Sequence, residues 1–249
     1  MHKPENSVRT VVLVPAFNEA GSIKRVVTNI TRTNPDVDVV VINDGSSDDT
    51  AQLAKEAGAT VLSLPVNLGY GAALQTGYKY ALMNDYDYTV QIDGDGQHDP
   101  RFIGQLITTL QDGMDVAIGS RFLDGNLGNY DNPTFRKLGM LFFRSLIYLF
   151  IKQKITDPTS GFQAMSRPVF GFFAKSNQYP SDFPDADIII LLHYAGFQVQ
   201  EVPVVMYNSE TGKSMHSGFK PLYYIVKMLL SIYAVMFGNE KLTKVGNAS

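Results

Sequence analysis

The chain has 249 residues, 45% of them hydrophobic, which is enough to bury a full core in one domain or two closely fused halves. Its net charge of −3 argues against a nucleic-acid partner, since phosphate backbones demand a basic face. The absence of cysteine excludes disulfides, zinc ribbons and thiol nucleophiles. Residues 1–10 are polar and lack the apolar core of a signal peptide, so we expect a cytoplasmic setting.

Strand and helix patterns alternate through the first half of the chain. Runs rich in β-branched residues predict strands, and the periodic segments between them predict helices. Alternation of this kind predicts an α/β fold with a mostly parallel central sheet and helices on both faces. Segments that follow the strands then lie at the carboxyl edge of the sheet, where open α/β folds bind ligands. The expected strands are 10–15, 37–43, 60–64, 88–92 and 115–118, and the expected helices are 22–33, 48–57, 71–83 and 101–111.

The pattern changes after Arg121, where a loop rich in Gly, Asn and Asp precedes further helices and one strand near 198–205. Two apolar segments, 138–151 and 222–237, fall short of the ~20 uninterrupted residues of a membrane span. Each is compatible with a core helix or with a helix lying in the membrane interface. The chain therefore divides into 1–121, 122–220 and a C-terminal segment at 221–249.

The most informative segment is 90–100, where an apolar strand leads into Asp93 and Asp95 with a glycine on each side of the second. Alternate residues of an extended chain point the same way, so both carboxylates can address one point. The glycines allow backbone and ligand to approach closely. Two convergent carboxylates suit Mg²⁺ or Mn²⁺, which bind one or two carboxylates together with substrate phosphates. A solvated acidic turn would show the same short pattern.

Further polar motifs follow the neighbouring strands. Residues 15–19 begin a helix after the first strand, and Asp44 precedes the next helix cap and is expected to be free to accept from a nucleobase or ribose. Small residues at 69–73 resemble a phosphate loop, and Arg121 supplies a cation for a phosphate. Each alone is also explained as an ordinary cap or turn. Together they indicate a ligand site at one edge of the sheet.

This set of motifs resembles the family 2 inverting glycosyltransferases of GT-A fold, a Rossmann-like α/β nucleotide-diphospho-sugar transferase architecture. Over roughly residues 8–217 it is similar to the polyprenyl-phosphate branch, which includes enzymes like dolichyl-phosphate mannose synthase. The resemblance implies metal-dependent transfer of a sugar, with inversion, from a nucleotide-diphospho-sugar donor to a polyprenyl phosphate of undecaprenyl or dolichyl type. It rests on residues 15–19, 43–48, 69–73, 93–98, 157–162, 201–204 and 212–214.

The resemblance also implies roles for individual residues. Asp95 and Gln97 match the position of the metal, Mg²⁺ or Mn²⁺, and Asp93 matches a contact to ribose or metal. Arg121 is expected to face a donor or acceptor phosphate. His98 either touches the diphosphate or is a structural residue that caps the turn at Asp99. Residues 1–121 would bind the donor, in a pocket formed by Pro15, Ala16, Phe17, Glu19, Asp44, Gly69, Gly71, Asp93 and Gly94.

Residues 122–220 would bind the acceptor, whose chemistry decides whether a general base is needed. A lipid phosphate is already an anion and can attack the anomeric carbon directly, whereas a sugar hydroxyl needs a carboxylate within hydrogen-bond reach. With a hydroxyl, Asp185 or Asp187 would be that catalytic base; with a phosphate, they would orient the sugar or cap a helix. We favour the phosphate, with Arg136 and Lys137 near it.

Many members of this branch carry membrane helices after the catalytic domain, whereas here an amphipathic helix and tail occupy 221–249. We therefore expect a peripheral protein at the inner face of the cytoplasmic membrane, docked on lipid or on a small membrane protein.

One alternative function is transfer to a saccharide hydroxyl in cell-surface polysaccharide synthesis. A second alternative is a sugar-1-phosphate nucleotidyltransferase, but such an enzyme carries a Gly-rich, Arg-containing loop after the first strand, and this chain has residues 15–19 there instead. A third is a non-catalytic binding module, which would leave residues 119–121 and 157–161 without a role.

Overall fold

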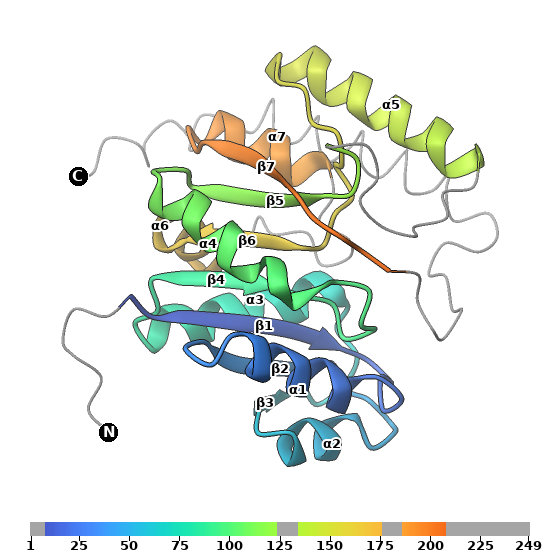
Figure 1. The fold of residues 1–249 in the computed structure, drawn as a ribbon, viewed down its shortest axis with the longest axis vertical. Helices are drawn as coiled ribbons and strands as arrows, with labels where there is room; N and C mark the ends of the chain where they lie inside the picture. The colour runs from blue at the N-terminus through green and yellow to red at the C-terminus, as the bar shows by residue number, and fades with distance from the viewer. Residues whose placement is uncertain (1–7, 124–133, 176–185, 208–249) are drawn as a thin grey trace.

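The protein is described by a computed structural model over residues 8–123, 134–175 and 186–207. Seven strands form one sheet in the order β3-β2-β1-β4-β6-β5-β7 (Figure 1). The β-branched runs form the strands because such side chains pack well on a pleated surface. The strands are β1 Thr10–Ala16, β2 Asp38–Asn43, β3 Thr60–Ser63, β4 Tyr88–Gln91, β5 Val116–Ser120, β6 Gln163–Ser166 and β7 Val199–Pro203.

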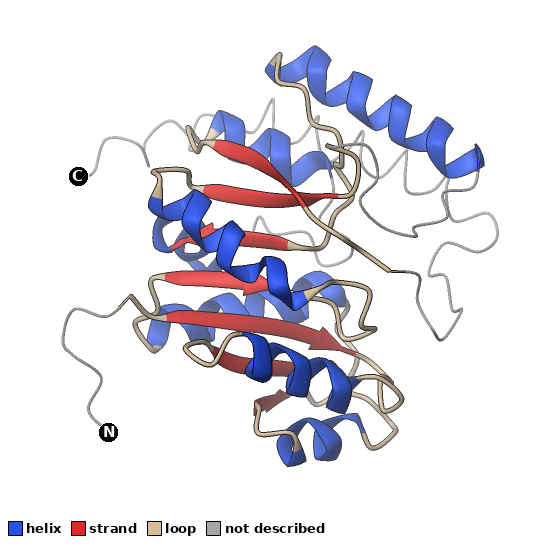
Figure 2. Ribbon diagram, in the orientation of Figure 1, coloured by secondary structure: helices blue, strands red, loops and turns tan. Residues whose placement is uncertain are grey.

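Helices cover both faces of the sheet, as the sequence predicts (Figure 2). Successive side chains of a strand point to opposite faces, so Leu13 of β1 packs in one core and Val14 in the other. The first core includes residues of α3, α5, α6 and α7, and the second includes residues of α1, α2 and α4. The helices are α1 Ile23–Thr33, α2 Thr50–Glu56, α3 Tyr70–Met83, α4 Ile103–Gln111, α5 Thr134–Ile151, α6 Arg167–Lys175 and α7 Ala186–Tyr194, with a short 3-10 helix at Pro100–Phe102.

Two elements, β6 and α6, were not predicted from the sequence. The strand β6 is four residues long and pairs antiparallel with both β4 and β5, whereas β1 to β5 and β7 run parallel to one another. Because β6 runs against its neighbours, its first residue, Gln163, lies at their carboxyl edge. The segment before β6 therefore reaches the edge where the predicted site residues gather.

The two predicted halves share this sheet, since β5 of the first half lies between β6 and β7 of the second. The predicted C-terminal part at 221–249, with its apolar segment 222–237, lies outside the described residues. Among the helices that the structure describes, none combines the length and apolarity needed to cross a membrane.

Candidate active site

The acidic pair, Asp93 and Asp95, follows β4 directly and is held by local hydrogen bonds. The Tyr70 hydroxyl donates to Asp93 Oδ1 at 2.6 Å, and the backbone N–H of Asp93 donates to His98 Nδ1 at 3.2 Å. The N–H of Gln97 donates to Asp95 Oδ1 at 3.0 Å. The carboxylates are therefore fixed within a turn at the carboxyl edge of the sheet, as the spacing predicts.

Negative charge accumulates at this turn. Burial raises the pKa of both Asp93 and Asp95, and the neighbouring charge of Asp93 raises the pKa of Asp95 further. Burial also raises the pKa of Glu19, although a hydrogen bond from Ser22 opposes it, and the charges of the acidic pair contribute to the rise. A bound cation would relieve this repulsion.

The donor set fits a hard divalent cation shared with a ligand. Within residues 8–123, 134–175 and 186–207, no group of three or more His, Asp or Glu side chains is arranged to hold a metal by itself. Two carboxylates with room for phosphate oxygens are what Mg²⁺ and Mn²⁺ sites use. Asp93 and Asp95 are suited to this role, and Gln97, part-buried in the same turn, is the third predicted ligand.

Asp44 is not free of partners, as the sequence suggests it to be, because both of its carboxylate oxygens already accept hydrogen bonds. Its side chain is buried, and its Oδ1 and Oδ2 accept from the backbone N–H groups of Leu68 and Gly69 at 2.8 and 2.9 Å. A buried carboxylate needs such donors, and these anchor the loop that leads into α3. Each oxygen keeps a second lone pair, so a ligand contact through Asp44 stays a prediction. Gly69 and Gly71 stand at the start of α3.

The loop after β1 forms the neighbouring wall. Pro15 and Ala16 are buried, whereas the Phe17 side chain is 46% exposed at the edge. A Cβ at Gly94 would lie 3.2 Å from the Pro15 carbonyl oxygen and 3.5 Å from Glu19 Cγ. The turn of the acidic pair thus packs directly against this wall, which brings Gly94 beside Pro15 and Glu19, two other residues predicted to bind the donor.

Arg121, at the end of β5, is bound to Asp157 in a buried ion pair. Its Nε and Nη2 lie 2.6 Å from Asp157 Oδ2 and Oδ1, and its Nη2 lies 3.2 Å from Thr159 Oγ1. The positive charge of Arg121 also acts to lower the pKa of Asp93. A phosphate contact by Arg121 stays a prediction, and Asp157 is a partner that the sequence motif contained but did not identify.

The segment that carries Asp157 is fastened by three other elements. Glu201 of β7 accepts from the N–H groups of Thr156 and Asp157, each at 2.7 Å. Arg144 of α5 donates to the Thr156 carbonyl at 2.6 Å, and Ser120 of β5 bonds the Thr156 hydroxyl at 2.6 Å. These hydrogen bonds hold the segment around Asp157 in place beside the end of β5.

Gly161 lies against the acidic pair. A Cβ at this position would stand 2.8 Å from Asp93 Oδ2 and 3.2 Å from the Tyr70 hydroxyl. Real Cβ atoms do not approach an oxygen this closely, so a larger residue here would force the Asp93 carboxylate or the chain to shift. The antiparallel β6 produces this contact, which the residue spacing did not reveal.

His98 is buried and packed within the turn, where its contacts differ from the predicted cap at Asp99, and a contact with the diphosphate stays a prediction. Its side chain is 3% exposed and stacks on Phe162 with ring centroids 5.1 Å apart. Burial lowers its pKa to about 4, so the ring is neutral and accepts from the Asp93 N–H. The turn at Asp99 is capped by Asp99 itself, whose Oδ1 accepts from the Arg101 N–H at 3.0 Å.

The predicted acceptor residues are only partly described. Asp187 is buried in the first turn of α7, where its Oδ1 accepts from the Ile188 N–H at 3.0 Å. Asp185 and the side chains of Arg136 and Lys137 lie outside the described residues. The structure therefore leaves the choice between hydroxyl and phosphate acceptors as a prediction.

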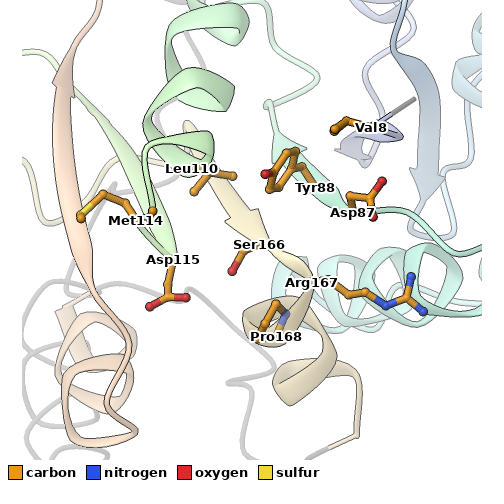
Figure 3. Close-up of a pocket in the computed structure, with 10 residues that line it drawn as sticks. Val8, Asp87, Tyr88, Leu110, Met114, Asp115, Ser166, Arg167 and Pro168 are labelled. Carbon is orange, nitrogen blue, oxygen red and sulfur yellow. The ribbon is translucent and has the colours of Figure 1, made fainter. Parts of the chain in front are cut away.

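A cavity of about 580 Å³ opens at the opposite edge of the sheet (Figure 3). Tyr88 at the start of β4, Asp115 before β5 and Ser166 at the end of β6 line it. It shares no lining residue with the acidic pair. Converging carboxylates and strand-end loops, rather than cavity size, therefore place the candidate active site at the carboxyl edge.

Comparison with known proteins agrees with this placement. The sequence profile of the family described as glycosyl transferase family 2 matches residues 11–172. The chain is 30% identical over 218 residues to polyprenol monophosphomannose synthase of Mycolicibacterium smegmatis, covering 84% of this chain and 82% of the relative. It is 26% identical over 240 residues to UDP-N-acetylglucosamine–dolichyl-phosphate N-acetylglucosaminyltransferase of Methanococcus voltae, covering 87% and 94%.

Among solved structures, the fold is similar to glucosyl-3-phosphoglycerate synthase from Mycobacterium tuberculosis in complex with Mn²⁺ and UDP-glucose, with a TM-score of 0.64. The identity is 21%, and the match covers 95% of this chain and 85% of that one. These findings leave the nucleotidyltransferase and binding-module alternatives without support. The chain belongs to glycosyl transferase family 2 and is a glycosyltransferase, in the branch whose relatives are named for sugar transfer to polyprenyl phosphates.

Proposed function

We propose that this glycosyltransferase moves a sugar from a nucleotide-diphospho-sugar to a polyprenyl phosphate, with inversion and with a divalent cation bound. The observation that carries the proposal is the acidic pair, whose part-buried carboxylates repel each other at the edge where the strand-end loops meet. Asp93, Asp95 and Gln97 would hold Mg²⁺ or Mn²⁺ beside the donor diphosphate. When bound, the cation would act as a Lewis acid that offsets the charge of the leaving diphosphate.

The chain's own residues would bind and orient the donor. The exposed ring of Phe17 offers a stacking surface for the base. Pro15, Ala16, Glu19, Asp44 and Gly94 would shape the base and ribose pocket. The Gly69 N–H is bonded to Asp44, so the backbone N–H of Gly71, in the first turn of α3, would face the diphosphate. Arg121 would face phosphate while Asp157 holds it in place.

The acceptor phosphate would supply the nucleophile. One of its oxygens attacks the anomeric carbon as the bond from that carbon to the diphosphate breaks, and the nucleoside diphosphate leaves with the electron pair. A phosphate monoester is anionic at pH 7, so this reaction needs no general base. The two relatives named above share a polyprenyl-phosphate type of acceptor although their names give different sugars, which supports the acceptor class rather than a particular sugar.

We also propose peripheral contact with the cytoplasmic membrane through α5. Leu141, Tyr148 and Leu149 are 55, 48 and 61% exposed and lie on one side of this helix by their spacing. The Lys152 amino group lies 5.8 Å from the Tyr148 ring centroid, a pairing suited to lipid headgroups. Flotation with anionic vesicles tests this contact: wild type should rise with the vesicles, and L149E should stay in solution.

The transfer reaction is tested with UDP-, GDP- and dTDP-sugars offered to polyprenyl phosphate, to the unphosphorylated polyprenol and to saccharides, in buffer stripped of metal and then supplied with Mn²⁺ or Mg²⁺. We expect product with the phosphate acceptor and metal only. D95N should lose at least about 100-fold in rate, the loss expected when several kcal/mol of charge stabilisation disappear. D112N, at an exposed position after α4, is the matched control and should keep the wild-type rate.

Two results would contradict the proposal. A D95N enzyme as active as wild type in metal-free buffer would exclude the metal-dependent reaction. Product with saccharides or polyprenol, but none with polyprenyl phosphate, would favour the hydroxyl acceptor and a base at Asp185 or Asp187.

A further inference from the structure

Three buried or part-buried side chains form a hydrogen-bonded relay that ends on Asp93. The Tyr78 hydroxyl donates to Gln91 Oε1 at 3.2 Å, and Gln91 Nε2 donates to the Tyr70 hydroxyl oxygen at 2.7 Å. The Tyr70 hydroxyl then donates to Asp93 Oδ1 at 2.6 Å. We call Tyr78, Gln91 and Tyr70 the relay. The two tyrosines lie two turns apart on one side of α3, and Gln91 ends β4.

The direction of the relay follows from what each group can donate. An ionised carboxylate only accepts, so the single proton of the Tyr70 hydroxyl lies on the bond to Asp93. The Tyr70 oxygen must then accept from Gln91, which turns Nε2 toward Tyr70 and Oε1 toward Tyr78. With the amide reversed, two oxygens would face each other at 2.7 Å with no proton between them. Every donor in the relay therefore points toward Asp93.

Burial makes the relay rigid and hard to replace by water. Tyr78 is 1% exposed and Gln91 is 3% exposed, so the hydrogen bonds between them are shielded from solvent. Gln91 lies two residues before Asp93 on the same extended segment, and Tyr70 starts the helix that follows the Asp44-anchored loop. The relay thus links the β4 turn to the loop expected to bind the donor.

The two oxygens of Asp93 have different surroundings. Oδ1 accepts from Tyr70, whereas Oδ2 stands 3.7 Å from His98 Nε2; a Cβ at Gly161 would lie 2.8 Å from Oδ2 and 3.3 Å from Oδ1. The Asp93 side chain is 28% exposed. Rotation of the Asp93 carboxylate would break the short hydrogen bond from the Tyr70 hydroxyl to Oδ1. The orientation of Oδ2 therefore depends on the relay.

We propose that Tyr70, backed by Gln91 and Tyr78, is a positioning residue that fixes the Asp93 carboxylate so that Oδ2 is presented to the divalent cation. This inference rests on the proposed function, because it assigns an orienting partner to one of the proposed ligands. Such partners of metal ligands typically change metal affinity about 10- to 100-fold when they are removed.

The test measures Mn²⁺ binding by the full chain, through the electron paramagnetic resonance signal of the unbound ion, with and without UDP. In Y70F only the hydroxyl is removed, and we expect Mn²⁺ affinity to fall about 10- to 100-fold. The matched control is Y86F, since the Tyr86 hydroxyl bonds the Asp38 carboxylate at 2.9 Å at the start of β2, on the opposite edge of the sheet. Both variants lose one tyrosine–carboxylate bond, but Y86F should bind Mn²⁺ as wild type does.

A second variant keeps Tyr70 and reverses the relay. In Q91E the new carboxylate can only accept, so it competes with Asp93 for the Tyr70 proton, and Mn²⁺ affinity should fall as in Y70F. This variant also serves if Y70F does not fold, which thermal melting of both proteins would reveal.

The outcomes separate the relay from the proposed function. Wild-type affinity in a folded Y70F or in Q91E would overturn the relay and leave the metal-dependent reaction standing. A wild-type protein that binds no Mn²⁺ with UDP, yet transfers sugar in the presence of chelator, would overturn the proposed function and the relay together.

Discussion

Arg121 and Asp157 form a two-point ion pair that is almost completely withdrawn from water. Nε lies 2.6 Å from Oδ2 and Nη2 lies 2.6 Å from Oδ1, and the two side chains are 11 and 0% exposed. Arg121 follows β5, whereas Asp157 precedes β6, so the pair joins the two predicted halves at the candidate active site. Buried charges persist only when they are paired, which makes each residue dependent on the other.

Removal of one member of this pair should be strongly destabilising. We expect D157N to lower the free energy of unfolding by about 3–5 kcal/mol, because Arg121 would keep a buried charge without its counter-charge. Replacing both residues together, as R121M with D157L, should cost less than the sum of the R121M and D157L single changes. Urea denaturation of D157N, the two single variants and the double variant measures this. A control is E56Q, which breaks the exposed pair of Glu56 with Lys24 and should leave the midpoint unchanged.

Gly161 gives a second prediction, which concerns its close contact with Asp93. In G161A the new methyl group would stand 2.8 Å from Asp93 Oδ2, so the carboxylate or the chain must shift. We expect a loss of about 1–3 kcal/mol in stability, as in other overpacked sites, together with a loss of sugar transfer. G104A is the matched control, because a Cβ on this α4 glycine meets nothing within 4 Å and should stabilise the helix slightly. Equal activity of G161A and wild type would contradict the close contact with Asp93.

The first five strands could be predicted from the sequence, because each is a run of β-branched or apolar residues between helical patterns. The observed bounds fall within two residues of the predicted ones, as for β5 at Val116–Ser120 against 115–118. The strand β6 could not be predicted, since Gln163–Ser166 is four residues long and carries no apolar alternation. Its place between β4 and β5 is decided by pairing with strands far away in the chain.

The candidate site likewise has a part that could be predicted from the sequence and a part that could not. The acidic pair was predicted because both carboxylates belong to one local motif. The contacts of Tyr70 with Asp93, of Asp157 with Arg121 and of Asp44 with the loop before α3 join residues from different elements. Residue spacing does not indicate contacts between distant elements. Asp44 was therefore expected to be free, although its oxygens accept hydrogen bonds from backbone N–H groups.

Asp44 itself gives a third prediction. In D44N one carboxylate oxygen becomes an NH₂ group, which would face the backbone N–H of Leu68 or Gly69 as donor against donor. We expect a loss of about 1–3 kcal/mol in the free energy of unfolding, the usual cost of a buried unsatisfied donor. Binding of UDP, measured by thermal shift, should weaken as well. If D44N is as stable as the exposed D112N variant, the anchoring of this loop by Asp44 is disproved.

His98 predicts how stability depends on pH in metal-free buffer. Burial lowers its pKa to about 4 in the folded protein, whereas an unfolded histidine titrates near 6.5. Between these values the unfolded state binds more protons, so the contribution of His98 to stability is fully present above pH 6.5 and is lost as the pH falls toward 4. The loss should approach about 3 kcal/mol.

The carboxyls of Asp93, Asp95 and Glu19 act in the opposite direction, since their raised pKa values let the folded state bind more protons as the pH falls. They remain in H98Q, so the difference in unfolding free energy between wild type and H98Q reports the histidine together with its charge interaction with Asp95. Urea denaturation at several pH values should show this difference rising from pH 4 to 6.5 and then levelling off. The glutamine of H98Q does not titrate, whereas the buried histidine ring must give up its proton to pack against Phe162. A difference that stays constant over this range would mean that His98 is protonated in the fold, and its acceptance of the Asp93 N–H would then be wrong.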